Sequence, residues 1–424
     1  MVTQIIPAPL TGSVRTPCSK SAAHRALIAA ALCASSTEFD ISCLSEDILA
    51  TTRCLEALGA KLIPLSQVRF RMEPISAQMI PPSVLLDCGE SGTTLRLLLP
   101  VVAALGATAR FTGHGQLPNR PIGELLTTLE ANGCHANAPA LPFSITGKLA
   151  SGTYSLPGNV SSQYISGLLF ALALLEKSSD IVLTTKLESS TYVAMTLHTL
   201  AAFGIQAQPT SAGYTIKGHQ CYSSPGSLEI EGDWSNAAFF LSAGALAGSV
   251  TITGLSGDSL QGDKALCDIL RRFGADVTEC ADSVIVCRRT LRGIDIDVSE
   301  VPDLFPVLAV VAAGATGTTR LFNAARLRIK ESDRIHAVAE MLRGLGADVN
   351  EQPDALLIHG KGHLSGGTVD GKNDHRIVMS AAVASVLCNE TVTIQGSNAV
   401  RKSYPHFFSD FNTLGGRANV IDAG

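Results

Sequence analysis

The sequence ALCDILRRFGA, residues 265–275, is a periodic apolar run that closes on a glycine and leads into a short apolar stretch. A similar phrase recurs about every 70 residues along the chain. The glycines at its centre are Gly59, Gly133, Gly204, Gly274 and Gly346. Glycine is typical of the left-handed residue that ends an α-helix. The spacing therefore predicts a chain built of repeated units, each with a helix that ends at one of these glycines.

A second phrase, a polar turn followed by a strongly apolar segment, recurs through the chain. The six turns are residues 16–21, 88–93, 159–163, 232–236, 300–303 and 372–375. Helices expected after four of these turns are residues 22–32, 94–105, 164–175 and 237–247, and they are apolar on nearly every side. A helix of this kind belongs at the centre of its unit. The sequence thus predicts six units of helices and strands.

We expect a mixed α/β fold of the α+β type, with two lobes of three units each. The predicted boundaries are residues 20–232 for one lobe and residues 1–19 plus 233–424 for the other. The chain would then cross twice between the lobes, near 18–20 and 232–234, as a hinge requires. The first turn of a helix attracts anions, because its N–H groups lack partners and the helix dipole is positive there. We expect the six turns to gather on the faces between the lobes.

The composition is that of a folded enzyme. Of the 424 residues, 46% are hydrophobic and 16% are charged, and the formal net charge is −5. These values argue against disorder and against a polybasic surface for nucleic acid. The apolar stretches fall short of the ~18 residues typical of a membrane span, and residues 1–10 do not resemble a signal peptide. We expect a cytoplasmic protein with neither a nucleic-acid nor a membrane partner.

The eleven cysteines are scattered, and no two of them form a C-x-x-C pair. Disulfide frameworks are typical of short secreted chains, and a structural zinc site needs clustered ligands. We therefore expect reduced thiols and no metal site.

Basic side chains concentrate at or beside the polar turns, although the protein as a whole is acidic. They are Lys20, Arg25, Arg96, Arg120, Lys330, Arg334, Arg376 and Lys402. A positive site on a negative protein favours a small anionic ligand, and guanidinium groups suit phosphate and carboxylate. Any one of these residues alone would be read as a solvated surface charge.

Two short motifs add acid–base groups to these cations. In KESDR, residues 330–334, the spacing places Lys330 and Arg334 on one helical face, with Glu331 adjacent and Asp333 available for an internal ion pair. In NDHR, residues 373–376, an imidazole that titrates near neutrality precedes an arginine. Each motif is read either as a salt-bridged helix start or as an anion clamp with a group that can move protons.

The ordered set of motifs resembles the 5-enolpyruvylshikimate-3-phosphate (EPSP) synthase family over nearly the whole chain. The motifs are residues 19–21 with Arg25, residues 91–93 with Arg96, and residues 119–123, 161–163, 231–233, 302–303, 330–334 and 373–376 with Lys402. The resemblance implies transfer of the enolpyruvyl group of phosphoenolpyruvate to the 5-hydroxyl of shikimate 3-phosphate, with release of phosphate. That reaction lies on the route to chorismate and the aromatic amino acids.

The resemblance also implies a fold, a cofactor requirement and a set of site residues. The fold is an inside-out barrel of six βαβαββ units, and the reaction needs no metal or organic cofactor. We expect a monomer with two small-molecule substrates. Shikimate 3-phosphate would contact Lys20, Ser21, Arg25, Ser161, Ser162, Ser189, Tyr192, Asp303 and Lys330. Phosphoenolpyruvate would contact Lys20, Gly92, Arg120, Gln163, Arg334, Arg376 and Lys402.

The reaction removes a proton from the hydroxyl and delivers one to the methylene carbon, and elimination from a tetrahedral intermediate then reverses that protonation. Asp303, with Lys330, is our candidate for the hydroxyl, and Glu331, with His375, for the methylene. Lys20 would neutralise or protonate the departing phosphate. The chain departs from the family pattern at Cys18, usually glycine, at Glu90, often a small amide residue, and at Arg326, often asparagine.

Three alternatives remain at this point. The sister enolpyruvyl transferase that acts on UDP-N-acetylglucosamine normally carries a catalytic cysteine before the Arg-Pro motif, and residues 114–119 contain none. A 3′-phosphate RNA cyclase has related repeats, but would need an adenylated histidine and a larger basic surface. An inactive anion-binding homologue is disfavoured because Lys20, Asp303 and Glu331 are all present.

Overall fold

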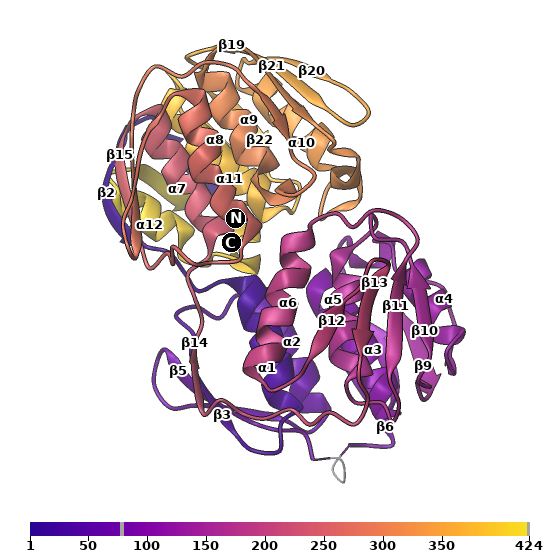
Figure 1. The fold of residues 1–424 in the computed structure, drawn as a ribbon. Helices are drawn as coiled ribbons and strands as arrows, with labels where there is room; N and C mark the ends of the chain where they lie inside the picture. Colours follow the sequence, from indigo (N-terminus) through magenta and orange to yellow (C-terminus); the bar gives the residue numbers. More distant parts are fainter. Residues whose placement is uncertain (77–79, 422–424) are drawn as a thin grey trace. The chain divides into compact units, whose positions relative to one another are not determined.

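The computed structural model describes residues 1–76 and 80–421. The chain divides into two compact units. Unit 1 consists of Met1–Ser19 and Glu231–Gly424, and unit 2 of Lys20–Ile230. Figure 1 draws both units as helices and four-stranded sheets.

Unit 2 contains three four-stranded sheets within the described residues. Their strands, in spatial order, are β14 (Ser227–Glu229), β3 (Thr37–Asp40), β5 (Arg69–Glu73) and β4 (Lys61–Pro64); β6 (Ser83–Asp87), β7 (Thr108–Thr112), β9 (Phe143–Gly147) and β8 (Cys134–Ala136); and β10 (Thr153–Leu156), β11 (Ser179–Leu183), β13 (Gly213–Ile216) and β12 (Ala207–Pro209). The first two strands of each sheet are parallel and the other pairs are antiparallel. One topology is therefore used three times.

The helices of unit 2 follow the same alternation. They are α1 (Lys20–Ala31), α2 (Glu46–Ala57), α3 (Gly92–Leu105), the short 3₁₀ helix η2 (Leu117–Asn119), α4 (Gly123–Glu130), α5 (Ser162–Leu172) and α6 (Ser190–Ala202). Helices α1, α3 and α5 are almost wholly buried, as their apolar sequences predict. Helix α5 packs closely on α3. The approach requires glycine at position 167, since a β-carbon there would collide with the backbone oxygen of Arg96.

Unit 1 repeats this topology in three more sheets. They are β2 (Leu10–Arg15), β15 (Gly248–Thr253), β17 (Ser283–Cys287) and β16 (Asp276–Glu279); β18 (Asp295–Asp297), β19 (Thr316–Phe322), β21 (Leu356–Lys361) and β20 (Asp348–Glu351); and β22 (Gly367–Asp370), β23 (Val392–Gln395), β1 (Val2–Ile6) and β24 (Arg417–Ile421). In the last sheet the N-terminal strand β1 lies between β23 and β24 and is antiparallel to both. The two ends of the chain thus complete one repeat.

The helical segments of unit 1 are α7 (Trp234–Leu246), η3 (Gly262–Ala265), α8 (Leu266–Phe273), η4 (Pro302–Leu304), α9 (Phe305–Gly314), η5 (Ala325–Ile329), α10 (Arg334–Gly344), α11 (His375–Ala384), η6 (Ser385–Leu387), η7 (Ser397–Lys402) and α12 (Phe407–Thr413). Helices α7, α9 and α11 pack against one another, and their apolar side chains belong to the core of this unit. The mixed α/β fold of six repeats predicted from the sequence is confirmed.

The helix-ending glycines also behave as predicted. All five have a positive φ, between 79° and 105°. A sixth, Gly415, has φ 88° and follows α12, and it was not predicted. Four of the polar turns supply the helix N-cap, through the side chains of Ser91, Ser161, Asp233 and Asp374.

Two stretches of chain connect the units, and they lie side by side in unit 1. Cys18 and Gly232 form an isolated antiparallel bridge. The N–H of Ser19 donates to the oxygen of Glu231 at 2.7 Å, and that of Asp233 to the oxygen of Pro17 at 2.9 Å. This extended backbone is open to any residue, so cysteine fits at position 18.

Among the described residues, no helix combines the length and the apolar character needed to span a bilayer.

Candidate functional site

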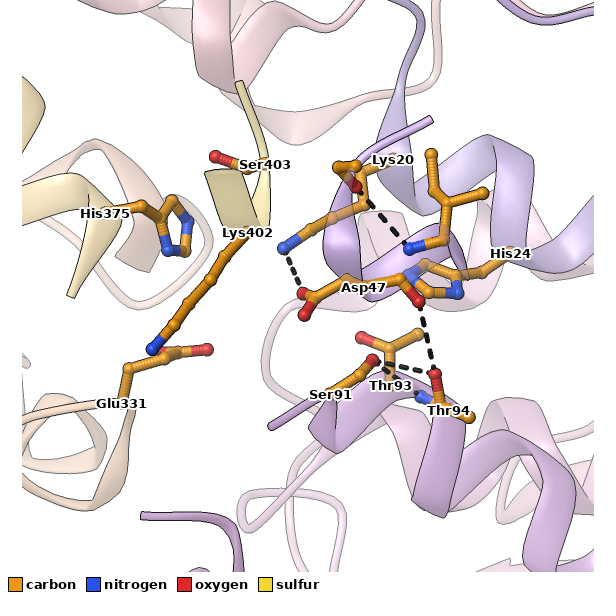
Figure 2. A network of polar contacts seen from close by, with 12 residues as sticks. Lys20, His24, Asp47, Ser91, Thr93, Thr94, Glu331, His375, Lys402 and Ser403 are labelled. Carbon is orange, nitrogen blue, oxygen red and sulfur yellow. Dashed lines mark hydrogen bonds and ion pairs between the residues drawn. The ribbon is translucent and has the colours of Figure 1, made fainter. Parts of the chain in front are cut away.

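Lys20 is the first residue of α1 and forms an ion pair with Asp47. The Nζ of Lys20 lies 2.7 Å from Oδ2 of Asp47, which stands in the first turn of α2 (Figure 2). Both side chains are mostly buried, with exposed fractions of 15% and 13%. Asp47 was not predicted as a site residue, although Ser45 followed by two acidic residues is a signal for the start of a helix. The pair fixes the ammonium group at the helix N-terminus.

Arg25 lies one turn further along α1 and is fully buried. Among the described residues, its hydrogen-bond partners are neutral oxygens: Nε donates to Thr196 Oγ1 at 2.8 Å, Nη1 to the oxygen of Ser21 at 2.7 Å and Nη2 to that of Tyr192 at 3.0 Å. Burial lowers the pKa of Arg25 to about 10. A buried cation without a carboxylate is costly, and the cost falls when an anion binds.

His24 begins a polar network inside unit 2. Its Nδ1 lies 2.7 Å from Thr51 Oγ1, which lies 2.7 Å from Thr94 Oγ1. Thr94 in turn donates to Ser91 Oγ at 2.8 Å, as Figure 2 shows. Burial, then the charges of Lys20 and Arg25, hold the pKa of His24 well below its usual value. A neutral imidazole therefore joins α1 to the start of α3.

The guanidinium groups of Arg96 and Arg120 both lie at the start of α3. Arg96 is buried, and its Nη1 donates to Gln163 Oε1 at 3.0 Å, while Gln163 Nε2 donates to Thr93 Oγ1 at 2.8 Å. The guanidinium group of Arg120 lies directly over Gly92. Gly92, Arg120 and Gln163, predicted together for phosphoenolpyruvate, are thus neighbours in unit 2.

The remaining predicted residues of unit 2 lie at helix starts. Ser161 caps α5, whose first residue is the buried Ser162. Ser189 precedes α6 with a φ of 54°, a left-handed conformation that is strained for serine. Tyr192 lies in α6, and its ring is 5.9 Å from the Arg25 guanidinium. Ser21 follows Lys20 in α1.

Arg334 is the centre of the polar cluster in unit 1. It is buried at the start of α10 and pairs with three carboxylates. Nη1 lies 2.8 Å from Asp303, Nη2 lies 2.7 Å from Glu331, and Nε lies 2.9 Å from Asp374. Burial disfavours its charge, but Asp374, Glu331 and Asp303 raise the pKa of Arg334 well above its usual value. The arginine remains charged and holds the three acids in place.

Asp303 lies in η4 between two arginines. Its Oδ1 accepts from Arg334, and its Oδ2 lies 3.1 Å from Arg376 Nη2. Burial alone would raise the pKa of Asp303, but Arg376, Arg334 and Lys330 lower it well below its usual range. The three cations therefore make this carboxylate a weak base.

One detail of the KESDR prediction is wrong. Lys330 ends η5 in an extended conformation, and α10 begins only at Arg334, with Asp333 as its N-cap. Lys330 and Arg334 therefore do not share a helical face. Asp333 pairs with Arg328, outside the motif, at 2.8 Å.

The NDHR segment contributes from the start of α11. His375 is buried, and its Nδ1 lies 3.8 Å from Asp374 Oδ1. Lys402 is also buried, and its Nζ donates to the oxygen of Asn373 at 2.6 Å. In Figure 2 the side chain of Lys402 extends toward Glu331. Lys330, Glu331, Arg334, His375, Arg376 and Lys402 therefore border one region of unit 1.

Asp263 and Asp374 also belong to this region, although neither was predicted as a site residue. Asp374 is buried, caps α11 and accepts a hydrogen bond from Ser332 Oγ at 3.0 Å. Asp263 is buried in η3, where its carboxyl group accepts a hydrogen bond from Ser235 Oγ. Asp374 could have been inferred from its place in the NDHR motif, whereas no local signal marks Asp263. Residues 1–76 and 80–421 hold no group of three or more His, Cys, Asp or Glu side chains suited to a metal ion.

The sequence model of one protein family, described as EPSP synthase (3-phosphoshikimate 1-carboxyvinyltransferase), matches residues 5–411. The chain belongs to the EPSP synthase family. A 3-phosphoshikimate 1-carboxyvinyltransferase of Clostridium novyi (strain NT) is 42% identical over 429 residues, which cover 99% of this chain and 98% of the relative. One of Clostridium acetobutylicum is 43% identical over 427 residues, covering 99% of both chains.

A solved structure agrees with these relatives. EPSP synthase from Acinetobacter baumannii superposes with a TM-score of 0.83 at 27% identity, over 99% of this chain and 100% of that one. The predictions of family, fold and reaction are confirmed. The protein is a 3-phosphoshikimate 1-carboxyvinyltransferase, a transferase of the shikimate pathway in aromatic amino acid biosynthesis. Membership of this EPSP synthase family implies shikimate 3-phosphate and phosphoenolpyruvate as substrates, and it decides against the UDP-N-acetylglucosamine enzyme.

Proposed function

We propose that Arg25 is a principal contact of shikimate 3-phosphate, with Lys20, Ser21, Ser161, Ser162, Ser189 and Tyr192 around the same substrate and Asp303 and Lys330 at its reacting hydroxyl. The observation that carries this proposal is the buried guanidinium group of Arg25, whose partners among the described residues are neutral. An anionic substrate would supply the negative charge that the neutral partners of Arg25 do not provide.

Phosphoenolpyruvate is assigned to the second set of cations. In unit 2 these are Lys20 and Arg120, with Gln163 and the backbone of Gly92; in unit 1 they are Arg334, Arg376 and Lys402. Planar guanidinium groups bind carboxylate and phosphate through two parallel hydrogen bonds. The contact of Arg120 with Gly92 supports the first group, since it allows the cation to approach the N–H groups at the start of α3.

The proposed chemistry is addition followed by elimination. Asp303, assisted by Lys330, takes the proton of the 5-hydroxyl as its oxygen bonds to the central carbon of phosphoenolpyruvate. Glu331, with His375, gives a proton to the methylene carbon and later removes one from the resulting methyl group. Lys20 neutralises the phosphate as its C–O bond breaks. The cationic side chains supply the charge neutralisation, and we propose that no metal or organic cofactor takes part.

The low basicity of Asp303 is a consequence of its two arginines, and substrate binding changes it. When a phosphorylated acid shares the charge of Arg334 and Arg376, those arginines stabilise the Asp303 carboxylate less, and its pKa rises. Asp303 would thus become a competent base only once the second substrate is present.

The experiment is a substitution of Arg25 by glutamine, which keeps a polar side chain but removes the charge. Loss of a buried charge contact costs about 2–5 kcal/mol, so we expect the KM for shikimate 3-phosphate to rise by at least about 30-fold. The KM for phosphoenolpyruvate should change much less. Arg289→Gln is the control, because Arg289 is 65% exposed and pairs with Asp276. An unchanged KM for shikimate 3-phosphate in a folded Arg25→Gln enzyme would remove Arg25 from the site.

We also propose that the enzyme is a monomer of the cytoplasm and that the paired crossings near 18–20 and 232–234 form a hinge. A reducing compartment is consistent with the cysteines, since all eleven of them lie among the described residues and none forms a disulfide there. The hinge proposal is supported by the short lengths of the two crossings and by their backbone pairing.

A further inference from the structure

Asp263 is a buried acid that the proposed mechanism does not use. Its side chain lies in η3 and is 2% exposed. One oxygen, Oδ2, accepts a hydrogen bond from Ser235 Oγ. The other, Oδ1, has no hydrogen-bond partner among the residues that the structure describes. A carboxylate oxygen left in this state is costly unless the group is protonated or faces a ligand.

The start of α7 does not need Asp263 as a cap. Gln261 Oε1 accepts from the N–H of Trp234 at 3.1 Å, and Asp233 Oδ1 accepts from that of Asn236 at 2.8 Å. Gln261 also donates to the oxygen of Gly232 at 2.8 Å. These two neighbours therefore cap the N–H groups of Trp234 and Asn236 without Asp263, so the capping role that an acid at this place would ordinarily serve is already filled.

Charged groups from three other segments act on Asp263. They are Asp303 in η4, Arg376 in α11 and Asp233 before α7. Burial and then the charge of Asp303 raise the pKa of Asp263 to about 7, while Arg376 and the hydrogen bond from Ser235 lower it. Burial and the nearby charge of Asp303 both favour the protonated form of Asp263, whereas three cations favour the ionised form of Asp303.

We propose that Asp263 is a positioning residue of this reaction, which places a second carboxyl group beside Asp303 and Arg376 and so sets the charge that these two groups present to phosphoenolpyruvate. The inference rests on the proposed role of Arg376 in holding that substrate. As the pH rises through neutrality, Asp263 acquires a negative charge. This charge competes with the anionic substrate for Arg376, and it makes Asp303 a stronger base.

The test compares the KM for phosphoenolpyruvate of wild-type enzyme and Asp263→Asn between pH 5.5 and 8.5. Asparagine has nearly the shape of the protonated acid but cannot ionise. The substrate's own phosphate titrates near pH 6, so the readout is the ratio of the two KM values, in which that titration cancels. We expect the KM of the wild-type enzyme divided by that of Asp263→Asn to be near one at pH 5.5 and to rise roughly five- to tenfold by pH 8.5. A ratio that stays flat across the range overturns the inference.

Ser235→Ala provides a second, independent readout. It removes the hydrogen bond that favours the ionised form of Asp263 but leaves the carboxyl group in place. The pH at which the KM rises should therefore move upward in Ser235→Ala. A midpoint that stays in place, or moves down, contradicts the proposal, and this arm remains decisive even if Asp263→Asn fails to fold.

Arg376→Gln separates failure of this inference from failure of the proposed function. If Arg376→Gln leaves the KM for phosphoenolpyruvate unchanged, the assigned role of Arg376 is wrong, and the inference falls with it. If Arg376→Gln raises that KM but the ratio for Asp263→Asn is flat, the proposed function stands and only the role of Asp263 is lost.

Discussion

Gly92 lies against the guanidinium group of Arg120. A β-carbon at Gly92 would stand 2.8 Å from Arg120 Nη1, closer than β-carbons approach other atoms, and 3.0 Å from Arg96 Nη1, which is a tight contact. The absence of a side chain at the first residue of α3 therefore allows both guanidinium groups to lie against the start of this helix.

Replacing Gly92 by alanine should displace Arg120, because the new methyl group occupies the place of its guanidinium end. We expect the KM for phosphoenolpyruvate to rise by about tenfold or more, and the KM for shikimate 3-phosphate to change less. Gly123→Ala is a matched control, since Gly123 also begins a helix and nothing lies within 4 Å of its β-position. Steady-state kinetics with both substrates checks this, and equal KM values for Gly92→Ala and wild type would contradict it.

Replacing Lys20 by methionine should lower kcat by two orders of magnitude or more, because the departing phosphate loses its neutralising group. The fold should persist, but the free energy of unfolding should fall by up to about 3–5 kcal/mol, because Asp47 is left without its partner in a mostly buried ion pair. Phosphate release and thermal unfolding measure the two effects. Lys61→Met, at an exposed position of β4, should leave both unchanged. A nearly normal rate for Lys20→Met would show that Lys20 does not act on the phosphate.

Asp303→Asn should reduce kcat strongly and the KM values little, as expected when a proton acceptor is lost and binding groups remain. The fold should persist, because Arg334 keeps its ion pairs with Glu331 and Asp374. Asp268→Asn is the control, since Asp268 is 81% exposed and pairs with Arg271. An effect confined to the KM would make Asp303 a binding group instead.

The buried His24 makes stability depend on pH below neutrality. Its folded pKa is well below 6.5, so in acid the unfolded chain binds a proton that the folded chain excludes. The free energy of unfolding should therefore fall as the pH drops below 6.5, by up to about 1.4 kcal/mol per pH unit from this group. Denaturant unfolding between pH 7 and 5 should show a shallower fall in His24→Asn than in wild type. His198→Asn, at an exposed position of α6, should keep the wild-type slope.

The repeats were predictable because their signals are local. A periodic apolar run before Gly59 or Gly346 specifies both a helix and its end, whatever the rest of the chain does. Gly415 was missed because α12 has only seven residues and is preceded by the irregular turn after η7, so no long periodic run announces it.

Pairings between distant segments were harder to predict from the sequence. Nothing in residues 2–6 indicates that they enter a sheet with β23 and β24, since an alternating strand fits many partners. The same is true of Asp263, which stands among Gln261, Gly262 and Lys264 and reads as an ordinary turn. Its burial beside Asp303 arises only when η3, η4 and α11 come together. Lys20 and Arg376 were singled out as basic residues at the polar turns, and the family resemblance implied their substrate roles. Their contacts came from the structure.

The position of β1 bears on the order in which the nascent chain acquires its structure. Unit 2 is one continuous segment, Lys20–Ile230. Unit 1 combines two distant segments, since Val2 pairs with both Gln395 and Ile421. Unit 2 can therefore fold while translation is still under way, but β1 cannot pair until β23 and β24 have been made. Until then both edges of residues 2–6 lack their partners and are open to aggregation. If a ribosome stalls before residue 392, unit 2 can fold, but unit 1 lacks the two strands that pair with β1.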